Sequence, residues 1–319
     1  MRRTPLRPLP APDLGIGEPA TVSTRTDATP AARPAAGEPV LRVAGLTCAI
    51  GGAVIVDDVS FDVAPGEFVA VIGPNGAGKT SLFNLLSGLL PATAGRVTLD
   101  GTDITGASPS ARARRGLGRT FQASSVFAGL SVRENVRLAA QARLGGSMRP
   151  WQRVRQGDAA HDVATRSLER VGLARRGEAL AGALSHGDKR KLELAILLAT
   201  DPAVVLLDEP MAGVSIEDGA GLTEVIAGVH REEGKTVLMV EHHMDVLLGL
   251  ADRVAVMHHG RLLALDTPAK VTSDPAVQQA YLGEELRPPN PCCDSRTCTC
   301  GSPAATSCRV STSPSAGAG

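Results

Sequence analysis

The sequence is poor in aromatic residues, which make up 2% of its 319 positions and include one tryptophan and one tyrosine. Proteins that bind single-stranded nucleic acid stack the bases on aromatic side chains, so this chain offers little surface of that kind. Its formal net charge is zero at pH 7. We therefore expect no nucleic-acid partner.

Long hydrophobic runs are also missing. No window approaches about 18 consecutive uncharged apolar residues, the length that marks a membrane-spanning helix. The N-terminus lacks the continuous apolar segment of a secretory signal. Sustained heptad repeats are absent as well, which argues against a long coiled coil. These absences predict a cytosolic protein.

Cysteines are scarce in the body of the chain, because five of the six lie close to the C-terminus. These five are Cys292, Cys293, Cys298, Cys300 and Cys308. Their spacing contains no C-x2-C pair, so zinc binding is an alternative to a tail with free thiols. Both ends of the chain are rich in small residues and proline without any period. We expect a disordered leader at 1–38, a folded domain at 39–286 and a disordered tail at 287–319.

A glycine-rich loop dominates what is present. Residues 73–80 read Gly-Pro-Asn-Gly-Ala-Gly-Lys-Thr and fit the pattern G-x-x-x-x-G-K-[ST]. An apolar run with β-branched residues precedes the loop at 67–72 and predicts a buried strand. Apolar residues at helical spacing follow at 81–90. The order of strand, glycine loop and helix is that of a phosphate-binding loop.

The residue types in the loop suit the binding of a nucleoside triphosphate. Gly73, Gly76 and Gly78 allow backbone turns that direct N–H groups at phosphate oxygens. Lys79 supplies a positive charge for the terminal phosphates, and Thr80 offers a hydroxyl to Mg²⁺. The N-terminus of the following helix adds a partial positive charge. We therefore expect ATP and Mg²⁺ as cofactors.

Other segments predict a mixed sheet. Short alternating strands at 40–43, 54–56, 59–63 and 95–101 indicate an antiparallel layer. Buried strands are expected at 204–207 and 236–240, a hairpin at 254–265, and helices at 132–143, 159–171 and 189–200. Asp208 and Glu209 directly follow the strand at 204–207. Charges at the end of an apolar strand indicate a functional site.

Four further motifs follow the phosphate loop in a fixed order. They are Arg119-Thr120-Phe121-Gln122, Leu184-Ser185-His186-Gly187-Asp188, Leu206-Leu207-Asp208-Glu209-Pro210 and Val240-Glu241-His242. With this series the chain resembles the ATPases of ABC transporters over about residues 40–283. The resemblance implies an α/β P-loop fold with a parallel core sheet, an antiparallel β subdomain and a helical subdomain inserted at about 123–190.

The resemblance also implies roles for individual residues. Glu209 is expected to act as general base, His242 to contact the γ-phosphate and the attacking water, and Gln122 to help hold Mg²⁺ and water. Asp208 is expected to hold Mg²⁺ through water, together with Thr80 and Gln122. Ser185 and the backbone of Gly187 are expected to reach the γ-phosphate held by a second subunit. The nucleotide-binding loop comprises Gly73, Pro74, Asn75, Gly76, Ala77, Gly78, Lys79, Thr80 and Ser81.

The adenine position departs from the family pattern. An aromatic residue usually stacks on the base just before the Gly51-Gly52 pair, but Ile50 occupies that place here. An aliphatic side chain can cover the ring without a π-face. Part of a stacking energy of about 1–3 kcal/mol is then lost, and we expect the phosphates to dominate binding.

Details of the motifs resemble the ATP-binding subunits of branched-chain amino acid importers, with urea and short-chain amide importers as the alternative. The resemblance implies transmembrane permeases, a second ATPase subunit in a homo- or heterodimer, and, indirectly, a periplasmic or lipid-anchored solute-binding protein. The location would be the cytoplasmic face of the cell membrane. Soluble ABC ATPases usually have two phosphate loops or a coiled-coil insertion, and neither occurs here. Glu209 and His242 argue against a regulatory module without turnover.

The stretch from Arg112 to Arg176 is strongly basic. It contains 14 arginines and four acidic residues in a chain of zero net charge. Two interpretations remain open. The helices of this stretch present a basic face to a permease and anionic lipid headgroups, or they are merely solvated.

Overall fold

The computed structural model describes residues 37–120, 126–144, 159–241 and 244–285. Residues 1–36 of the predicted leader and all of the predicted tail lie outside these ranges. Two predicted site residues, Gln122 and His242, also lie outside them.

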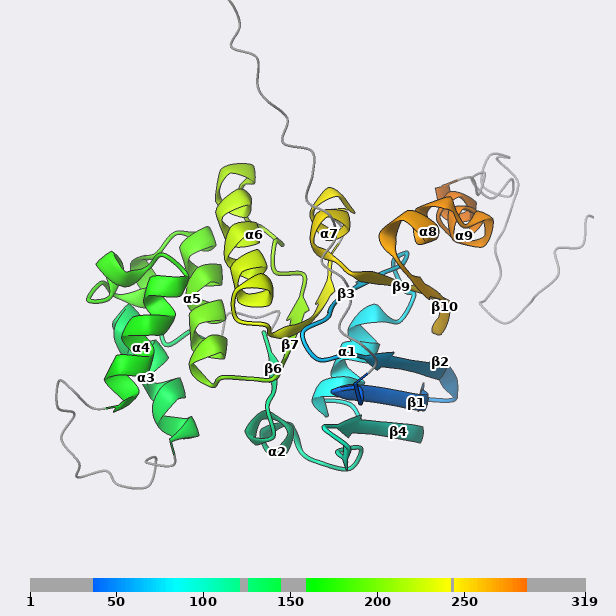
Figure 1. The fold of residues 1–319 in the computed structure, drawn as a ribbon, viewed down its shortest axis with the longest axis horizontal. Coiled ribbons are helices and arrows are strands. Elements are labelled where there is room, and N and C mark those ends of the chain that lie inside the picture. Colours follow the sequence, from blue (N-terminus) through cyan, green and yellow to red (C-terminus); the bar gives the residue numbers. More distant parts are fainter. Residues whose placement is uncertain (1–36, 121–125, 145–158, 242–243, 286–319) are drawn as a thin grey trace, which may run out of the picture. The chain divides into compact units, whose positions relative to one another are not determined.

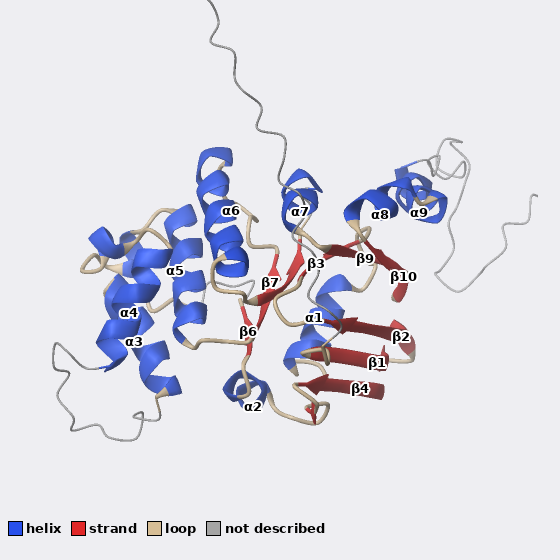
Figure 2. Cartoon of the chain, in the orientation of Figure 1, coloured by secondary structure: helices blue, strands red, loops and turns tan. Residues whose placement is uncertain are grey.

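A six-stranded sheet forms the centre of the folded part, in the order β10-β9-β3-β8-β7-β6 (Figure 2). All neighbouring strands are parallel except β10, which is antiparallel to β9. The strands are β3 (Phe68–Ile72), β6 (Leu117–Arg119), β7 (Val204–Asp208), β8 (Thr236–Val240), β9 (Arg253–His258) and β10 (Arg261–Asp266). The strand predicted at 236–240 has the expected bounds.

The sheet is buried on both faces, as expected for parallel strands covered by other layers. In β3 the side chains of Phe68, Ala70 and Ile72 join one apolar cluster, and those of Val69 and Val71 join another. The first cluster contains side chains of the helices α3 to α8, and the second contains α1 and the antiparallel sheet. The alternation of side chains along a strand is why every residue of β3 is apolar.

A four-stranded antiparallel sheet has the order β2-β1-β4-β5. Its strands are β1 (Leu41–Ile50), β2 (Ala53–Val63), β4 (Ala94–Leu99) and β5 (Thr102–Asp103). The prediction of two strands at 54–56 and 59–63 was wrong, because β2 is continuous. Asp58 has a positive φ of 51° at the expected break. Pairing of Cys48 with Val56 and of Leu46 with Val59 carries the strand across it, with a register shift.

The helix after the phosphate loop, α1 (Lys79–Ser87), begins and ends earlier than the predicted range of 81–90. Gly88 ends it with a left-handed φ of 78°. A buried arginine then satisfies its last carbonyls. Arg112, on α2 (Pro109–Arg114), donates from Nη1 to the carbonyl oxygens of Leu85 and Leu86 at 2.6 and 2.7 Å. The end of α1 is thus closed by a contact between distant segments.

Three helices pack together in the inserted region, where Figure 1 shows them in green. They are α3 (Val132–Arg143), α4 (Ala159–Arg170) and α5 (His186–Ala199), with short 3-10 turns at Ala174–Arg176 and Ala181–Ala183. The helix predicted at 132–143 has the expected bounds. The remaining helices are α6 (Ile216–Arg231), α7 (Met244–Leu250), α8 (Pro268–Ser273) and α9 (Pro275–Glu285).

Five of the 14 arginines of the basic stretch form ion pairs with acids from other segments of the fold. Arginines at 119, 133, 143, 170 and 176 pair with Asp208, Glu178, Asp201, Glu233 and Asp188. All five acids lie outside the stretch, so its excess of positive charge is not the charge of the surface that it forms. The interpretation as a face for anionic headgroups stays a prediction, and the ion pairs weaken it.

Candidate functional site

The phosphate loop connects the carboxyl end of β3 to the start of α1 and is enclosed by other segments. A Cβ atom on Gly73 would lie 2.2 Å from the carbonyl oxygen of Met257, and one on Gly78 would lie 2.9 Å from that of Ile55. Both positions therefore require glycine, because backbone cannot move away as a flexible side chain would. The Gly260 N–H also donates to the carbonyl oxygen of Ala77 at 3.1 Å.

Lys79 is the first residue of α1 and is 6% exposed. Its ammonium donates to the carbonyl oxygens of Gly73 and Pro74 at 2.5 and 3.0 Å. The loop thus wraps around a positive charge at the N-terminus of a helix, and both features favour an anion. Thr80 and Ser81 follow in the first turn of α1 and are half-buried. The predicted phosphate-binding residues thereby lie together in one loop and one helix turn.

Asp208 is the last residue of β7, and its side chain is fully buried. Its Oδ2 accepts a hydrogen bond from Arg119 Nη2 at 2.8 Å, while Oδ1 is buried with no hydrogen-bond partner in the described part of the chain. Burial raises the pKa of the Asp208 carboxyl, whereas the guanidinium of Arg119 and the ammonium of Lys79 act in the opposite direction. Lys79 follows β3 and Asp208 ends β7, and the carboxyl ends of these strands meet at one edge of the sheet.

The residues at this point fit a magnesium ion. Mg²⁺ takes oxygen ligands, commonly one or two carboxylates, with waters and phosphate oxygens completing the shell. Asp208 would offer a carboxylate oxygen that is buried without a partner among the described residues. Thr80, in the first turn of α1, would offer a hydroxyl. Among the described residues no group of three or more histidine, cysteine or acidic side chains forms a metal cluster. This donor set therefore fits an ion bound together with a nucleotide rather than a site made of protein ligands alone.

Glu209 follows Asp208 and has a backbone conformation that is unfavourable for a residue with a Cβ. Its φ is 48°, in the left-handed region, and its N–H donates to the carbonyl oxygen of Val240 at 2.9 Å. Strained conformations of this kind persist where the surrounding structure holds them, and they are common at active sites. The side chain is half-buried. Asp58, Asp100, Asp201 and His259 have a similar φ, so the strain agrees with a catalytic role for Glu209 only together with its place after Asp208.

Glu241 has a contact that sequence reasoning missed. It follows β8, is 3% exposed, and its Oε1 accepts a hydrogen bond from the backbone N–H of Met211 at 2.7 Å. This bond ties the segment after Glu209 to the end of the neighbouring strand. The predicted catalytic His242 is the next residue in the chain, outside the described ranges. The only sequence signal for Glu241 was its place in the Val240-Glu241-His242 motif.

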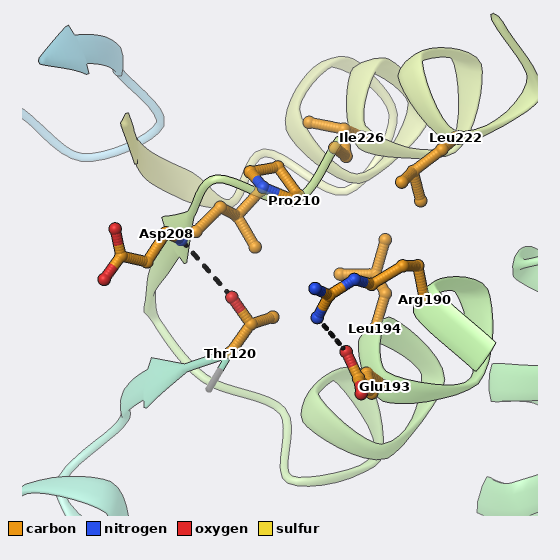
Figure 3. Close-up of a pocket in the computed structure, with 9 residues that line it drawn as sticks. Thr120, Arg190, Glu193, Leu194, Asp208, Pro210, Leu222 and Ile226 are labelled. Carbon is orange, nitrogen blue, oxygen red and sulfur yellow. Dashed lines mark hydrogen bonds and ion pairs between the residues drawn. The ribbon is translucent and has the colours of Figure 1, made fainter. Parts of the chain in front are cut away.

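A small cavity of about 10 Å³ lies between β7 and α5 (Figure 3). Thr120, Asp208 and Pro210 line one side, and the ion pair of Arg190 with Glu193 lines the other at 2.9 Å. The Thr120 hydroxyl accepts a hydrogen bond from the Asp208 N–H at 3.4 Å. A cavity of this volume accommodates about one water molecule. Predicted Gln122 lies two residues beyond Thr120, outside the described residues.

The second predicted phosphate contact lies at the start of α5. Ser185 is its N-cap, and its hydroxyl accepts a hydrogen bond from the Asp188 N–H at 3.2 Å. A Cβ on Gly187 would lie 2.7 Å from the side chain of Asp218 on α6, so this glycine is also required by packing. Ser185 and His186 are exposed. The first two residues of this helix end are therefore accessible from outside, whereas Gly187 is buried against α6.

Ile50 lies at the end of β1, next to the Gly51-Gly52 turn, and 52% of it is exposed. Val54, on the other side of the turn, is 54% exposed. Strand β2 then runs to Ile55, whose carbonyl oxygen lies against Gly78 of the phosphate loop. The exposed side chains of Ile50 and Val54 thus lie in the hairpin whose second strand contacts the phosphate loop.

Comparison with known proteins places these features in a family. A family model described as "ABC transporter" matches residues 56–212, and one described as "Branched-chain amino acid ATP-binding cassette transporter" matches residues 261–286. The chain is 38% identical over 253 residues to the high-affinity branched-chain amino acid transport ATP-binding protein LivG of Salmonella typhimurium, covering 77% of this chain and 99% of that protein. The chain belongs to the LivG-like family of ABC transporter ATP-binding proteins.

Two further similarities define how far this assignment reaches. The lipopolysaccharide export system ATP-binding protein LptB of Escherichia coli is 35% identical over 247 residues, covering 77% of this chain and 98% of that protein. The crystal structure of the ADP conformation of MJ1267, an ATP-binding cassette of an ABC transporter, superposes with a TM-score of 0.68 and 29% identity, covering 77% and 100% of the two chains. The predicted fold class is confirmed.

As a member of this family, the chain is an ATP-binding ATPase subunit of a transporter, which implies permease partners. Within the part of the chain that the structure describes, no helix is both long and apolar enough to span a bilayer. The prediction of an ABC ATPase made from the motifs is confirmed.

Proposed function

We propose that this ABC ATPase uses ATP hydrolysis to drive the import of branched-chain amino acids through separate permease subunits. The support for this cargo lies in LivG and in the family model at 261–286, a region that contains β10, α8 and α9 and lies outside the nucleotide site. The similarity to LptB indicates that the shared ATPase core does not by itself select the cargo. Urea and short-chain amides are the alternative cargo.

One observation carries the proposed chemistry, namely the arrangement of three charged side chains at the carboxyl ends of parallel strands. Lys79 follows β3, and Asp208 and Glu209 end β7, with β8 between these two strands. Ligands of open α/β sheets bind at this edge. A cation, a metal-binding carboxylate and a second carboxylate are the groups needed to hold a triphosphate and to activate water.

Each side chain then has a distinct task. The backbone N–H groups of the loop and Lys79 bind the phosphate oxygens, while Asp208 and Thr80 would hold Mg²⁺. When bound, Mg²⁺ neutralises negative charge on the phosphates. Glu209 accepts the proton of the attacking water as general base. Gln122 and His242 would contribute to positioning this water, as their motifs predict.

The exposed start of α5 requires a partner to act on a nucleotide. We propose a second ATPase subunit, which is a copy of this chain or a paralogue. Ser185 and the Gly187 backbone would contact the γ-phosphate of the ATP bound to that second subunit. The complex would lie at the cytoplasmic face of the membrane and receive substrate through a periplasmic or lipid-anchored binding protein. A groove of about 240 Å³ between α1, α2, β6 and α5, lined largely by apolar side chains, is a suitable contact for a permease.

The proposal is tested by transport in a bacterial strain that lacks its own LivG-type ATPase but retains the permeases and binding protein. Expression of this chain should restore uptake of labelled leucine, and the Glu209→Gln variant should not. Restored uptake of labelled urea or acetamide, with leucine uptake unchanged by the chain, would assign the alternative cargo. ATP hydrolysis by the purified chain without restored uptake of any of these solutes would contradict the proposed import function.

A further inference from the structure

The guanidinium of Arg119 joins three elements of the fold. It lies at the end of β6, and its Nη2 donates to Asp208 Oδ2 on β7 at 2.8 Å. Its Nη1 donates to Asn84 Oδ1 and Ser87 Oγ, both on α1, at 2.8 and 2.7 Å. The side chains of Arg119 and Asp208 are 8% and 0% exposed. One buried cation therefore connects the helix of the phosphate loop to the acidic end of β7.

The bonds to Arg119 make the two carboxylate oxygens of Asp208 unequal. Oδ2 is fixed by the guanidinium, whereas Oδ1 is buried and has no protein partner in the described part of the chain. Leaving a buried carboxylate oxygen without a partner is unfavourable, so such an atom is expected to meet a ligand or water. Arg119 Nε is also buried without a hydrogen-bond partner there. The Arg119–Asp208 pair thus makes one specific hydrogen bond, and each side chain keeps one polar atom without a hydrogen-bond partner in the described part of the chain.

We propose that Arg119 is a positioning residue for the metal-binding carboxylate. By holding Oδ2, it fixes the rotation of the Asp208 side chain and leaves Oδ1 to the magnesium ion and its waters. Asn84 and Ser87 of α1 hold Arg119 in turn. The position of the Asp208 carboxylate is thereby fixed relative to α1, the helix that also carries Lys79 and Thr80. The proposal rests on the proposed function, in which Asp208 holds Mg²⁺.

The competing explanation is that Arg119 only neutralises a buried acid. Removing the charge at position 119 would disturb the site under both explanations. Changing the shape of the side chain while keeping its charge distinguishes them. Arginine presents a planar fork of donors that reaches Asp208 and α1 together, whereas lysine keeps the charge and loses the fork. Changes to residues that orient a metal ligand commonly lower metal affinity by about 10- to 100-fold. Arg119→Lys should therefore affect the metal more than the nucleotide.

The chain offers a matched control in Arg112. Both arginines are largely buried and both bond the last turn of α1, but Arg112 donates to the backbone carbonyls of Leu85, Leu86, Thr105 and Ala107 rather than to Asp208. Arg112→Lys therefore loses a comparable fork at the same helix end. It should change the stability of the fold without a specific effect on the metal.

The experiment measures the affinity of the full chain for a fluorescent ATP analogue, once in EDTA and once in Mg²⁺, in the Glu209→Gln background. We expect Arg119→Lys to weaken binding about tenfold in Mg²⁺ and to leave binding in EDTA unchanged. Arg112→Lys should change the two affinities by equal factors. Equal factors for Arg119→Lys, or no change in either affinity, would overturn the proposal and leave Arg119 as a structural ion pair.

A second variant keeps the test open if Arg119→Lys does not fold. In Asn84→Ala the ion pair remains and one of the bonds that orient the guanidinium is lost, so a loss of about threefold in Mg²⁺ alone is expected, below the range for a fully removed partner. No change in Mg²⁺ would count against the proposal. Asp208→Asn tests the premise, because unchanged metal dependence in that variant would refute Asp208 as the ligand and the inference with it. Loss of metal dependence in Asp208→Asn but not in the Arg119 and Asn84 variants would refute the inference alone.

Discussion

The phosphate loop and the start of α5 are two helix N-termini suited to anions, but the chain treats them differently. Gly73, Ala77 and Lys79 of the loop are buried beneath Met257 and β2, and the loop's ammonium is bonded within the loop. At α5 the cap residue and the residue after it are exposed. The loop is enclosed by other segments of the chain, whereas we propose that the exposed start of α5 is contacted by a second subunit.

The two helix N-termini also differ in the charged residues of their first turns. The first turn of α1 has no acidic residue, so its positive end remains available to a ligand. The first turn of α5 carries Asp188, which interacts favourably with the helix dipole and pairs with Arg176 at 2.7 Å. We therefore expect the loop to bind phosphate without a partner, whereas the charge of the α5 end is partly compensated and should add binding only on dimer formation. The following experiments test this contrast.

The largest effect is expected for Glu209→Gln. Loss of the general base should lower turnover by about 10²- to 10⁴-fold while ATP binding with Mg²⁺ is kept, so an ATP-held dimer should accumulate. Phosphate release and size-exclusion chromatography measure the two outcomes. Glu224→Gln, an exposed acid on α6, is the control. Turnover equal to that of the parent would remove Glu209 from the mechanism.

Two substitutions distinguish the role of the start of α1 from that of the start of α5. Lys79→Met should weaken ATP binding to the isolated subunit by more than tenfold, because the loss of a charge-assisted contact amounts to about 1.5–3 kcal/mol. Gly187→Ala should keep this binding and lose hydrolysis, since its Cβ would meet Asp218 at 2.7 Å.

Gly219→Ala is the control for the glycine, because a Cβ there meets nothing within 4 Å. Calorimetric titration and phosphate release distinguish binding from turnover. If Gly187→Ala weakened ATP binding by a single subunit as strongly as Lys79→Met, the start of α5 would not be an open half-site.

Arg112→Met tests whether the phosphate helix is held from within. The change leaves the carbonyl oxygens at the end of α1 without their donor, and we expect the free energy of unfolding to fall by about 3 kcal/mol. Urea denaturation measures this value. Arg114→Met, on the same helix but exposed, should stay within about 0.5 kcal/mol. Equal effects of both changes would show that the cap contributes little.

The adenine side of the loop should respond more weakly. Ile50→Tyr adds a stacking surface and should raise ATP affinity about tenfold, if about 1.4 kcal/mol is recovered. The parent should discriminate poorly between ATP and GTP. Nucleotide titrations with Mg²⁺ measure both, and Leu263→Tyr on β10 is the control, being likewise an exposed aliphatic residue. Strong ATP preference in the parent, with no gain in the variant, would mean that another residue covers the base.

The smallest effect is expected from removing the ends. A chain of residues 39–286 should melt at the same temperature and hydrolyse ATP at the same rate as the full chain, because we propose that neither end buries apolar surface. Differential scanning calorimetry and phosphate release provide the comparison. A large fall in melting temperature, or zinc released stoichiometrically by a chelator, would show that the cysteine-containing tail has a structural role.

The sequence alone determined the features that depend on neighbouring residues. The glycine loop, the strand at 236–240 and the helix at 132–143 follow from local spacing of glycine and apolar residues, and the structure contains all three. The adjacent acids at 208 and 209 were recognisable for the same reason, since they end a continuous apolar run. Ser185 was identified from the resemblance of its motif to those of the family, and the structure has it as the N-cap of α5.

Only the tertiary structure decided the contacts between distant segments. Arg119 and Asp208 are 89 residues apart, and Met211 and Glu241 are 30 apart, so no local pattern pairs them. Five arginines of the basic stretch pair with acids that lie outside it in the sequence and that the fold brings to them. Such pairs depend on which strands become neighbours, and this is set by burial of the whole core. The sequence therefore specified which chemical groups the site contains, and the fold specified how each of them is held.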